Sequence, residues 1–521
     1  MSSVEFQSPI DNRTALFEQL QRPLGVDLPS NFRVMSRILH EFHQMTQLDV
    51  GFLNQAVEAV AVGERLEFSH LSSVDQHLIR EFSAREQIEE ADRLILVANN
   101  AIGDNIYNIL PTVHMLHLFF LAHPEQKKKL TIYIQHPDLV AGFPEVYDFV
   151  EVVPMPRPYY GYQSLEPRHI PDLSQEIAEG EKVFIFSGLA HDKEKVHLLQ
   201  SRLSRWNEII GMAHIDIGQY TDFLPPYNGI ITGASRLARQ MELLLNERLI
   251  DDPTDVDKLL FPIPQAILDA RSQLMQELGL RAGANIHILI DTGSTLMKRW
   301  TDEQIVDFLT EMVRYGEELD DNGQPRDTQA QIIFIEDPVK ALTPEGQILR
   351  DKITTISSSR IKIVRFPSLS GLMTLYALSD ADAPIMTITG ADSGPTHLAN
   401  AMGVYSLSVF TIANPFVWTL DRDTTKVVAT DAAIELGDPR IGVYINIAPL
   451  GWTRNELSLS TRRQRQELIK AYTKGGIPLE VAQNMSLPQP MEAVDIQEII
   501  PTWGQMVEEA HERRNNGEAR R

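Results

Sequence analysis

Short apolar runs alternate with amphipathic stretches from about residue 93 onward, and this alternation predicts an α/β protein. The runs are rich in β-branched and aliphatic residues, which is typical of buried parallel strands. They form two series, the first at 94–98, 130–135, 150–154 and 183–187, and the second at 287–291, 330–335, 361–365, 383–389 and 404–410. Between them lie stretches with apolar residues at helical spacing, such as Thr301–Tyr315 and Ser370–Ser379. Each series therefore predicts one Rossmann-like domain with helices on both faces of a parallel sheet.

The same patterning divides the chain into four parts. Residues 1–90 show only helical spacing and are predicted to form a helical N-terminal extension. Residues 91–255 and 265–445 are the two predicted domains, and the proline-rich, charged stretch 251–264 is the best candidate for a linker. Residues 446–521 are again predicted to be helical and end in a charged tail.

Composition narrows the class of protein. The 521 residues are too many for one compact core, and the apolar fraction of 43% is enough for globular packing. A net charge of −24 disfavours a general nucleic-acid binder, and the lack of cysteine excludes disulfides, thiolate metal sites and a cysteine nucleophile. The first residues do not resemble a signal peptide, and the longest apolar stretch, Met115–Ala122, is far below the roughly 20 residues of a membrane span. We therefore expect a cytoplasmic protein.

The most specific chemistry lies in Gly390–Gly403 (GADSGPTHLANAMG). This segment leaves the predicted strand 383–389, makes a tight Asp-Ser-Gly turn and opens a helix, with His397 one turn into it. Backbone N–H groups at such a turn, together with the helix dipole, favour an anionic group such as a diphosphate. The competing interpretation is an ordinary helix with Asp392 as its N-cap and His397 tied into the core.

A second loop, Asp291–Trp300 (DTGSTLMKRW), leaves the first strand of the second domain. It offers hydroxyl, amide and cationic donors, contributed by Thr292, Gly293, Ser294, Lys298 and Arg299. A leaving diphosphate needs such charge compensation whenever no metal supplies it. The alternative is a solvated basic turn before a helix, in which Trp300 is a packing anchor.

A third loop, Asn99–Asp104 (NNAIGD), leaves the first strand of the first domain. Gly103 allows close backbone approach or a positive φ, and Asp104 begins the next helix. A carboxylate there can take a proton from a substrate hydroxyl, since its reference pKa near 4 keeps it ionised at neutral pH; helix capping is the alternative. Glu336, at the end of the strand 330–335, is a weaker candidate for holding ribose hydroxyls.

Other common motifs are absent or discounted. The chain has no Walker A, Gly-x-Gly-x-x-Gly or Gly-x-Ser-x-Gly sequence. Asp380-x-Asp382 and Asp421-x-Asp423 match the pattern of metal-dependent sugar-nucleotide enzymes, but the first lies at a helix–strand junction, facing away from the expected cleft. The histidines of helical segments are expected to pack or face solvent rather than bind metal; these are His40, His43, His114, His117 and His123.

Three stretches, in order and in approximate spacing, resemble glycosyltransferase family 9, the bacterial ADP-heptose lipopolysaccharide heptosyltransferases and their relatives. Leu94–Pro111 is similar to the family's opening strand, Gly-Asp turn and helix, and Asp291–Asp302 to its small-residue loop with Lys-Arg-Trp. Leu369–Phe410 carries the most specific match, Asp-Ser-Gly-x-x-His-Leu-Ala. The similarity covers about residues 92–440. The helical leader departs from the family, as does Glu336-Asp337-Pro338 in place of a Gly-rich nucleotide loop.

The resemblance implies a GT-B fold, in which two Rossmann-like domains face a cleft and bind the acceptor on the N-terminal domain and the nucleotide-sugar on the C-terminal one. It also implies transfer with inversion at the anomeric carbon, without metal or other cofactor. By position, Asp104 would be the catalytic base and Lys298 the contact to the diphosphate. The implied phosphate-binding turn comprises Asp392, Ser393, Gly394 and His397. The helices after residue 445 would cross back to the first domain.

The leading hypothesis is an inverting glycosyltransferase that moves a heptose-like or hexose sugar from a nucleotide-diphosphate donor to a hydroxyl of a glycan, lipid or protein. A non-catalytic nucleotide-sugar-binding or assembly protein, oligomerising through its N-terminal helices, is the alternative. A GT-B epimerase would need further acid and base residues that the sequence does not identify. We expect no nucleic-acid partner, while peripheral membrane association and homo-oligomerisation stay open.

Overall fold

The computed structural model describes residues 84–98, 102–155, 177–188, 209–215, 232–433 and 461–515, the last two ranges with internal gaps of up to six residues. The chain divides into two compact units that part between Leu259 and Leu260. This point lies inside the stretch 251–264 expected to link the domains. The predicted helices of residues 1–83 lie outside the described residues.

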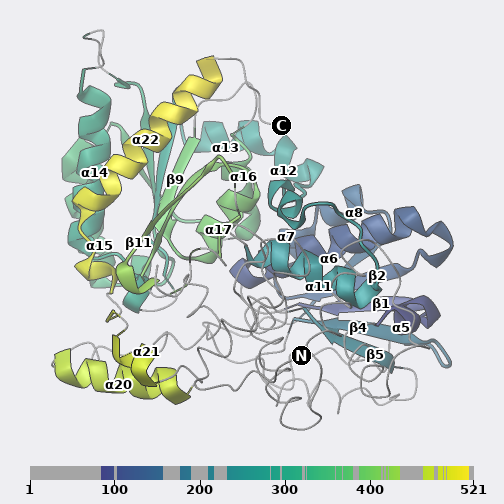
Figure 1. The fold of residues 1–521 in the computed structure, drawn as a ribbon. Coiled ribbons are helices and arrows are strands. Elements are labelled where there is room, and N and C mark those ends of the chain that lie inside the picture. Colours follow the sequence, from purple (N-terminus) through teal and green to yellow (C-terminus); the bar gives the residue numbers. More distant parts are fainter. Residues whose placement is uncertain are drawn as a thin grey trace. The chain divides into compact units, whose positions relative to one another are not determined.

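The first unit contains a five-stranded parallel sheet in the order β3-β2-β1-β4-β5 (Figure 1). Its strands are β1 (Arg93–Val97), β2 (Lys129–Ile134), β3 (Val150–Pro154), β4 (Val183–Ser187) and β5 (Ile209–His214). Its α-helices are α5 (Arg85–Glu90), α6 (Ile102–Ala122), α7 (Pro137–Val140), α8 (Phe143–Val146) and α11 (Gly233–Leu245), with 3₁₀ helices η2 (Pro124–Gln126) and η6 (Pro253–Lys258). The order of strands reverses between β1 and β4. From β1 the chain adds β2 and β3 on one side, and it then adds β4 and β5 on the other.

The core of the first unit follows from its apolar strands. Leu94, Ile95, Leu96 and Val97 of β1 are all fully buried, as expected for a central parallel strand covered on both faces. Ile95 and Val97 share one cluster with neighbours from β2 and β4. The long helix α6 packs against α11.

The second unit contains a six-stranded parallel sheet in the order β11-β10-β9-β6-β7-β8 (Figure 1). Its strands are β6 (Ile286–Ile290), β7 (Gln331–Ile335), β8 (Ile361–Val364), β9 (Met386–Ala391), β10 (Tyr405–Phe410) and β11 (Thr425–Ala429). Its α-helices are α12 (Gln265–Asp269), α13 (Arg271–Glu277), α14 (Asp302–Glu317), α15 (Pro344–Ser357), α16 (Leu369–Tyr376), α17 (Gly394–Ala401), α20 (Thr461–Lys474) and α22 (Ile496–Asn515), with 3₁₀ helices η7 (Leu296–Lys298), η8 (Lys340–Leu342) and η10 (Met491–Ala493). The short α21 (Leu479–Asn484) lies where the two units divide. In chain order the sheet is a doubly wound 6-5-4-1-2-3 arrangement, which reverses between β6 and β9.

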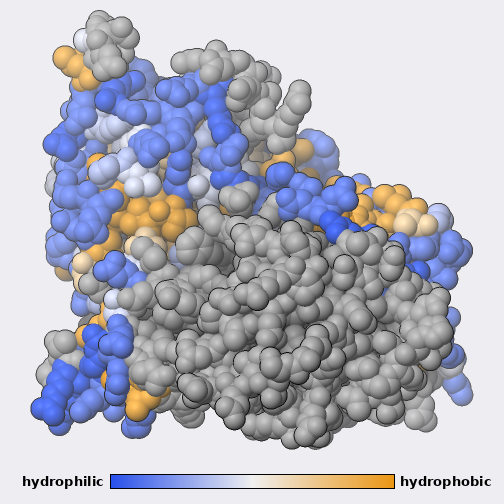
Figure 2. All heavy atoms as spheres, viewed as in Figure 1, coloured by the Kyte–Doolittle hydropathy of each residue, from blue (hydrophilic) through white to orange (hydrophobic). Residues whose placement is uncertain are grey.

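The final helix belongs to the second unit. Its apolar residues recur at three- and four-residue spacing and are buried in the core of the second sheet; they are Ile499, Trp503, Met506, Val507 and Ala510. The Trp503 ring packs edge-on against His287 of β6, with ring centres 5.3 Å apart, and Figure 1 shows α22 lying along the sheet beside α14. The hydrophilic surface over α22 in Figure 2 fits this one-sided burial. α22 thus packs on the second sheet, and the expected crossing of the chain after residue 445 back to the first domain stays a prediction.

The structure confirms the predicted α/β architecture with two Rossmann-like sheets. The two strands that the sequence analysis did not name, β5 and β11, are the last strands of their sheets. Residues 265–277 form two helices, α12 and α13, which meet at Ala270, and Gly279 just beyond them has a φ of 56°. Within the described part of the chain, no helix combines the length and the apolar character needed to cross a bilayer.

Candidate functional site

The candidate residues of the second unit gather at the carboxyl ends of β6 and β9. These strands pair directly, and each leads into an aspartate, Asp291 after β6 and Asp392 after β9. The next residues, Thr292 and Ser393, bring their hydroxyl oxygens to 3.0 Å from each other. Open α/β sheets bind ligands at the point where strand order reverses. The two loops therefore meet where this fold places a ligand.

The carboxylate of Asp392 is the centre of the cluster. Its Oδ2 forms an ion pair with Lys298 Nζ, and its Oδ1 lies 2.8 Å from Nε2 of His397. Only 5% of the Asp392 side chain and 13% of the Lys298 side chain are exposed. Burial by itself would raise the pKa of Asp392, but the Lys298 charge and the His397 hydrogen bond hold this pKa well below its usual range. Asp392 is therefore ionised, and it fixes the positions of both partners.

The start of α17 is open. Ser393, not Asp392, is the N-cap residue, with φ −152° and ψ 157°, and its side chain makes no capping hydrogen bond. The capping role considered for Asp392 is therefore wrong. The Ser393 hydroxyl lies 3.2 Å from that of Thr396, which donates to the carbonyl of Ala391 at 2.9 Å. Because the first N–H groups of a helix lack intrahelical partners, a start that no side chain caps suits an anion.

Gly293 allows the Lys298 loop to fold onto itself. A Cβ atom at this position would lie 2.7 Å from the Lys298 carbonyl oxygen and 2.9 Å from the carbonyl carbon. The Arg299 Nε also donates to the Gly293 carbonyl at 3.1 Å. The close approach lets the 3₁₀ helix η7 present Lys298 to Asp392. Ser294, the remaining candidate of this loop, lies outside the described residues.

The loop is anchored behind the cluster. Trp300 is buried and packs against Phe308, with ring centres 6.0 Å apart, which confirms its predicted role as a packing anchor. Thr301 and Gln304 form a reciprocal capping box at the start of α14. The Gln304 Nε2 also donates to the carbonyls of Met491 and Val494, at 2.6 and 2.8 Å. The segment around η10 thus supports the loop that carries Lys298.

Sequence reasoning missed a further cation beside this loop, in addition to Lys298 and Arg299. Lys340 Nζ lies 3.0 Å from Asp291 Oδ2 and 2.8 Å from Asp302 Oδ1. Burial raises the pKa of Asp291 even with Lys340 beside it. Burial opposes the charged form of Lys340, yet the charge of Asp291 and the hydrogen bond to Asp302 raise its pKa. Lys340 therefore ties the end of β6 to the start of α14; its place after β7, a strand end of the same sheet, was the available signal.

The carboxylate of Glu336 is engaged by an arginine of α15. Arg350 binds it with two hydrogen bonds, Nε to Oε1 at 2.8 Å and Nη2 to Oε2 at 2.7 Å, and the Glu336 side chain is buried. The neighbouring Asp337 accepts from the amides of Val339 and Lys340, both at 2.8 Å, and so shapes the turn. The structure thus places Glu336 in an ion pair apart from the Asp392 cluster, and its contact with ribose stays a prediction.

Gly103 and Asp104 belong to the first unit, where they lie in the first turn of α6. This helix follows β1, one of the two strands between which the first sheet reverses. Gly103 is helical and buried, so the positive φ that glycine permits is not needed there. Asp104 is partly exposed. Each unit thus carries candidates just after the first strand of its own sheet, and the second unit carries further ones after β7 and β9.

Of the discounted Asp-x-Asp motifs, one aspartate lies in the described part of the chain. Asp380, Asp382 and Asp421 lie outside that part, and Asp423 pairs with Arg513 at 2.9 Å. The described residues contain no group of three or more histidines and carboxylates arranged to hold a metal ion. Burial and the charge of His117 lower the pKa of His114 to about 4, consistent with a packed histidine of α6.

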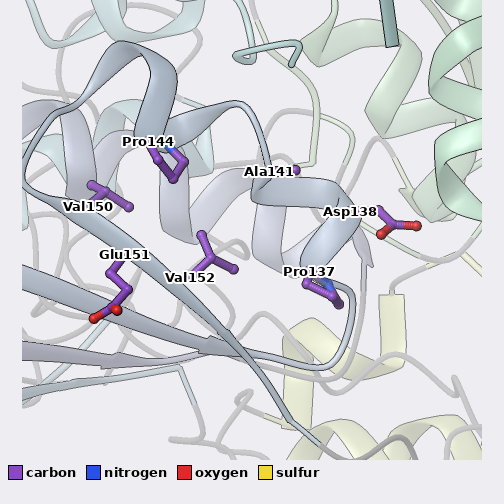
Figure 3. A pocket seen from close by; sticks show the side chains of 7 residues that line it. All are labelled: Pro137, Asp138, Ala141, Pro144, Val150, Glu151 and Val152. Carbon is purple, nitrogen blue, oxygen red and sulfur yellow. The ribbon is translucent and has the colours of Figure 1, made fainter. Parts of the chain in front are cut away.

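A shallow hollow lies elsewhere, beside the edge strand β3 (Figure 3). Proline, valine and alanine side chains form most of its lining, together with Asp138 and Glu151, which lie well apart. Glu151 is paired with Lys129 at 2.6 Å. None of the candidate residues lines this hollow.

Comparison with known proteins gives structural matches alone. No protein-family model matches the chain, and a search of curated proteins finds no match. The matching solved structures include a glycosyl transferase family 9 protein from Veillonella parvula, at 13% identity and a TM-score of 0.48, with 81% of this chain and 99% of that one covered. Escherichia coli heptosyltransferase WaaC with ADP matches at 12% identity and a TM-score of 0.39, with 65% and 93% covered. E. coli ADP-heptose lps heptosyltransferase II matches at 10% identity and a TM-score of 0.41, with 67% and 96% covered. At these identities and TM-scores the matches indicate the fold, and the function has to be inferred from the residues of the site.

Proposed function

We propose that this protein is a glycosyltransferase that uses a nucleoside-diphosphate sugar as donor. One observation carries the proposal: the Lys298–Asp392–His397 cluster and the paired hydroxyls of Thr292 and Ser393 lie where the second sheet reverses its strand order. The motifs that supply these residues are those that resemble glycosyltransferase family 9.

The donor diphosphate would bind at the start of α17. Its oxygens would accept hydrogen bonds from the amides of the turn at Ser393 and Gly394 and from the hydroxyls of Thr292 and Ser393. Lys298 would contact the diphosphate. Asp392, itself bound by His397, would hold the Lys298 side chain in place. Donors held rigidly before the reaction stabilise the charge that develops on a leaving group.

Asp104 would be the general base. In the proposed step the acceptor hydroxyl gives its proton to the Asp104 carboxylate as its oxygen forms a bond to the anomeric carbon. The bond from that carbon to the donor phosphate breaks, and the diphosphate leaves with the electron pair. Attack opposite the leaving group inverts the anomeric carbon, and protein donors stabilise the leaving diphosphate without a metal. The acceptor would be a hydroxyl of a glycan, lipid or protein.

The first experiment identifies the donor. Thermal unfolding of the full chain is measured with a panel of nucleoside diphosphates, since a ligand that binds the folded state raises the melting temperature by mass action. The corresponding sugar donors are then tested for hydrolysis and for transfer to acceptors. A panel in which no nucleoside diphosphate binds would contradict the proposal.

The second experiment tests the chemistry. Asp104→Asn should lower turnover by about 10²–10⁴-fold while donor affinity stays near that of the wild type. Lys298→Ala should weaken donor binding and turnover together. Donor binding without transfer by the wild type would instead support a non-catalytic nucleotide-sugar-binding protein, and normal turnover by Asp104→Asn would remove Asp104 from the mechanism.

A further inference from the structure

The charge of Lys298 is already compensated within the protein. Lys298 forms its ion pair with a carboxylate that is ionised and buried, and both side chains are largely shielded from solvent. The second oxygen of the same carboxylate is taken by His397. A diphosphate carries more than one negative charge, so a site in which the lysine is balanced by an aspartate needs positive charge from another group.

The residue next to Lys298 has the required properties. Arg299 is exposed, unlike Lys298 and Trp300 on either side of it. Its Nε donates to the carbonyl of Gly293 at 3.1 Å. Among the described residues, no acceptor engages the two Nη groups, so these groups are available to a ligand.

The Gly293 bond holds the Arg299 side chain against the loop that also carries Thr292. Gly293 directly follows Thr292, whose hydroxyl lies 3.0 Å from that of Ser393. The Arg299 Cγ comes within 3.1 Å of the position that a Cβ on Gly293 would take. The Arg299 side chain therefore lies along the loop between β6 and α14, with its Nε tethered to the Gly293 carbonyl.

We propose that Arg299 is a second phosphate-binding cation of this site and makes it prefer nucleoside diphosphates over nucleoside monophosphates. This inference rests on the proposed function and deepens it. A guanidinium binds phosphate oxygens through two parallel hydrogen bonds, which a lysine cannot reproduce. Lys298, held by Asp392, orients the loop and contacts the ligand, whereas Arg299 supplies the uncompensated charge.

The test uses the full chain and a nucleoside diphosphate that raises its melting temperature, together with the matching monophosphate. Affinities for wild type, Arg299→Ala and Arg299→Lys are measured by calorimetry at about 50 and 300 mM salt. Arg299→Ala should weaken diphosphate binding about tenfold and monophosphate binding less than threefold, and Arg299→Lys should fall between. The loss should shrink at the higher salt concentration, because exposed charges are screened.

Arg314→Ala is the matched control. Arg314 lies on α14 of the same unit and pairs with Glu311 and Glu318, so its loss removes one positive charge without touching the loop. Its diphosphate affinity should equal that of the wild type.

The outcomes separate the two proposals. If Arg299→Ala binds the diphosphate as tightly as the wild type does, this inference alone is overturned. Equal losses for monophosphate and diphosphate, insensitive to salt, would also overturn it, because they would show that Arg299 only supports the loop through Gly293. A wild-type protein that binds no nucleoside diphosphate would overturn the proposed function, and this inference with it.

Discussion

Thr292 and Ser393 are 101 residues apart in the chain, yet their hydroxyl oxygens lie 3.0 Å from each other. Each follows the aspartate that ends a central strand of the second sheet, one after β6 and the other after β9. The contact arises because these strands are neighbours in the sheet although β7, β8 and the helices α14, α15 and α16 lie between them in sequence. It fixes the spacing between the loop that carries Lys298 and the helix that carries His397.

Replacement of Lys298 by methionine should destabilise the fold. The variant keeps the length of the side chain but leaves the Asp392 carboxylate buried with His397 as its remaining partner. Removal of one member of a buried ion pair typically lowers the free energy of unfolding by about 3–5 kcal/mol, and the slight exposure of Lys298 places this variant at the lower end. Urea denaturation measures the change.

The double variant Lys298→Met with Asp392→Asn tests the cause. Without the buried charge, the free energy of unfolding should return to within about 1 kcal/mol of the wild type, whereas nucleotide affinity should stay low. Lys352→Met is the control, since this exposed lysine pairs loosely with Glu303 at 3.6 Å. Its loss should change the free energy of unfolding by less than about 0.5 kcal/mol. A double variant no more stable than the single one would show that charge burial is not the reason.

Replacement of Gly293 by alanine should disturb the loop. The added Cβ would meet the Lys298 carbonyl oxygen at 2.7 Å, so the backbone has to shift. We expect a loss of about 1–3 kcal/mol in the free energy of unfolding, as for other overpacked sites, and a tenfold or greater loss of nucleotide affinity because Lys298 moves. Calorimetry measures the nucleotide affinity, and urea denaturation of the same samples measures the free energy of unfolding.

Gly504→Ala is the matched glycine control. Its Cβ would meet the Tyr315 ring at 3.4 Å, an ordinary contact, and Gly504 lies within helix α22. Alanine favours a helix over glycine by up to about 1 kcal/mol, so this variant should be as stable as the wild type or more so. Unchanged nucleotide affinity in Gly293→Ala would show that the close approach to Lys298 is not needed for binding.

The two-domain architecture was predictable because its central strands are short, apolar and regularly separated by helices. Parallel strands buried on both faces leave this signature in sequence. The sequence signature of β11 is weaker, since Thr425–Ala429 is only half-buried. The place of α22 could not be inferred from its own pattern, because an amphipathic helix specifies that it packs but not on which sheet.

The residues that gather around Asp392 were predictable from the sequence, but their contacts and the neighbouring Lys340 were not. Turn chemistry indicated Thr292, Gly293, Lys298 and the Asp-Ser-Gly segment. The sequence could not show that Asp392 would hold Lys298 and His397 instead of capping α17, because that choice depends on where η7 folds. It also could not show that Arg350, fourteen residues along, would occupy Glu336.

Gln304 should matter more to stability than an ordinary capping residue. Its Oε1 accepts from the Thr301 amide at 3.0 Å, while its Nε2 donates to the carbonyls of Met491 and Val494. Gln304→Ala removes the capping box and takes a side-chain donor from two carbonyls, of which that of Met491 keeps the Val494 amide at 3.0 Å. It should therefore lower the free energy of unfolding by about 2–3 kcal/mol. Thr301→Ala removes only the cap and should lower it by about 1 kcal/mol. Equal effects of the two variants in urea denaturation would show that the bonds to η10 add nothing.

The buried His287 should make the second unit sensitive to acid. It lies in a closed environment between Thr387 of β9, whose Oγ1 is 2.8 Å from Nδ1, and Trp503 of α22. Burial is the main cause that lowers its pKa to about 4; Asp327 opposes the shift, and His511 and Arg360 add to it.

Because the folded pKa of His287 lies below its unfolded value of 6.5, the unfolded chain binds more protons between pH 6.5 and pH 4. The stability that neutral His287 contributes is therefore fully present above about pH 6.5 and is lost as the pH falls toward 4. From pH 7 to pH 5 this one group should lower the free energy of unfolding by about 2 kcal/mol.

The variant His287→Gln isolates this contribution. Glutamine keeps a polar side chain near Thr387 but cannot titrate, so urea denaturation followed by tryptophan fluorescence should show a smaller drop between pH 7 and pH 5 than in the wild type. The difference between the two drops should be about 2 kcal/mol, since groups common to both proteins cancel. Parallel pH dependence in the two proteins would contradict the prediction, because it would mean that His287 binds a proton as readily when folded as when unfolded.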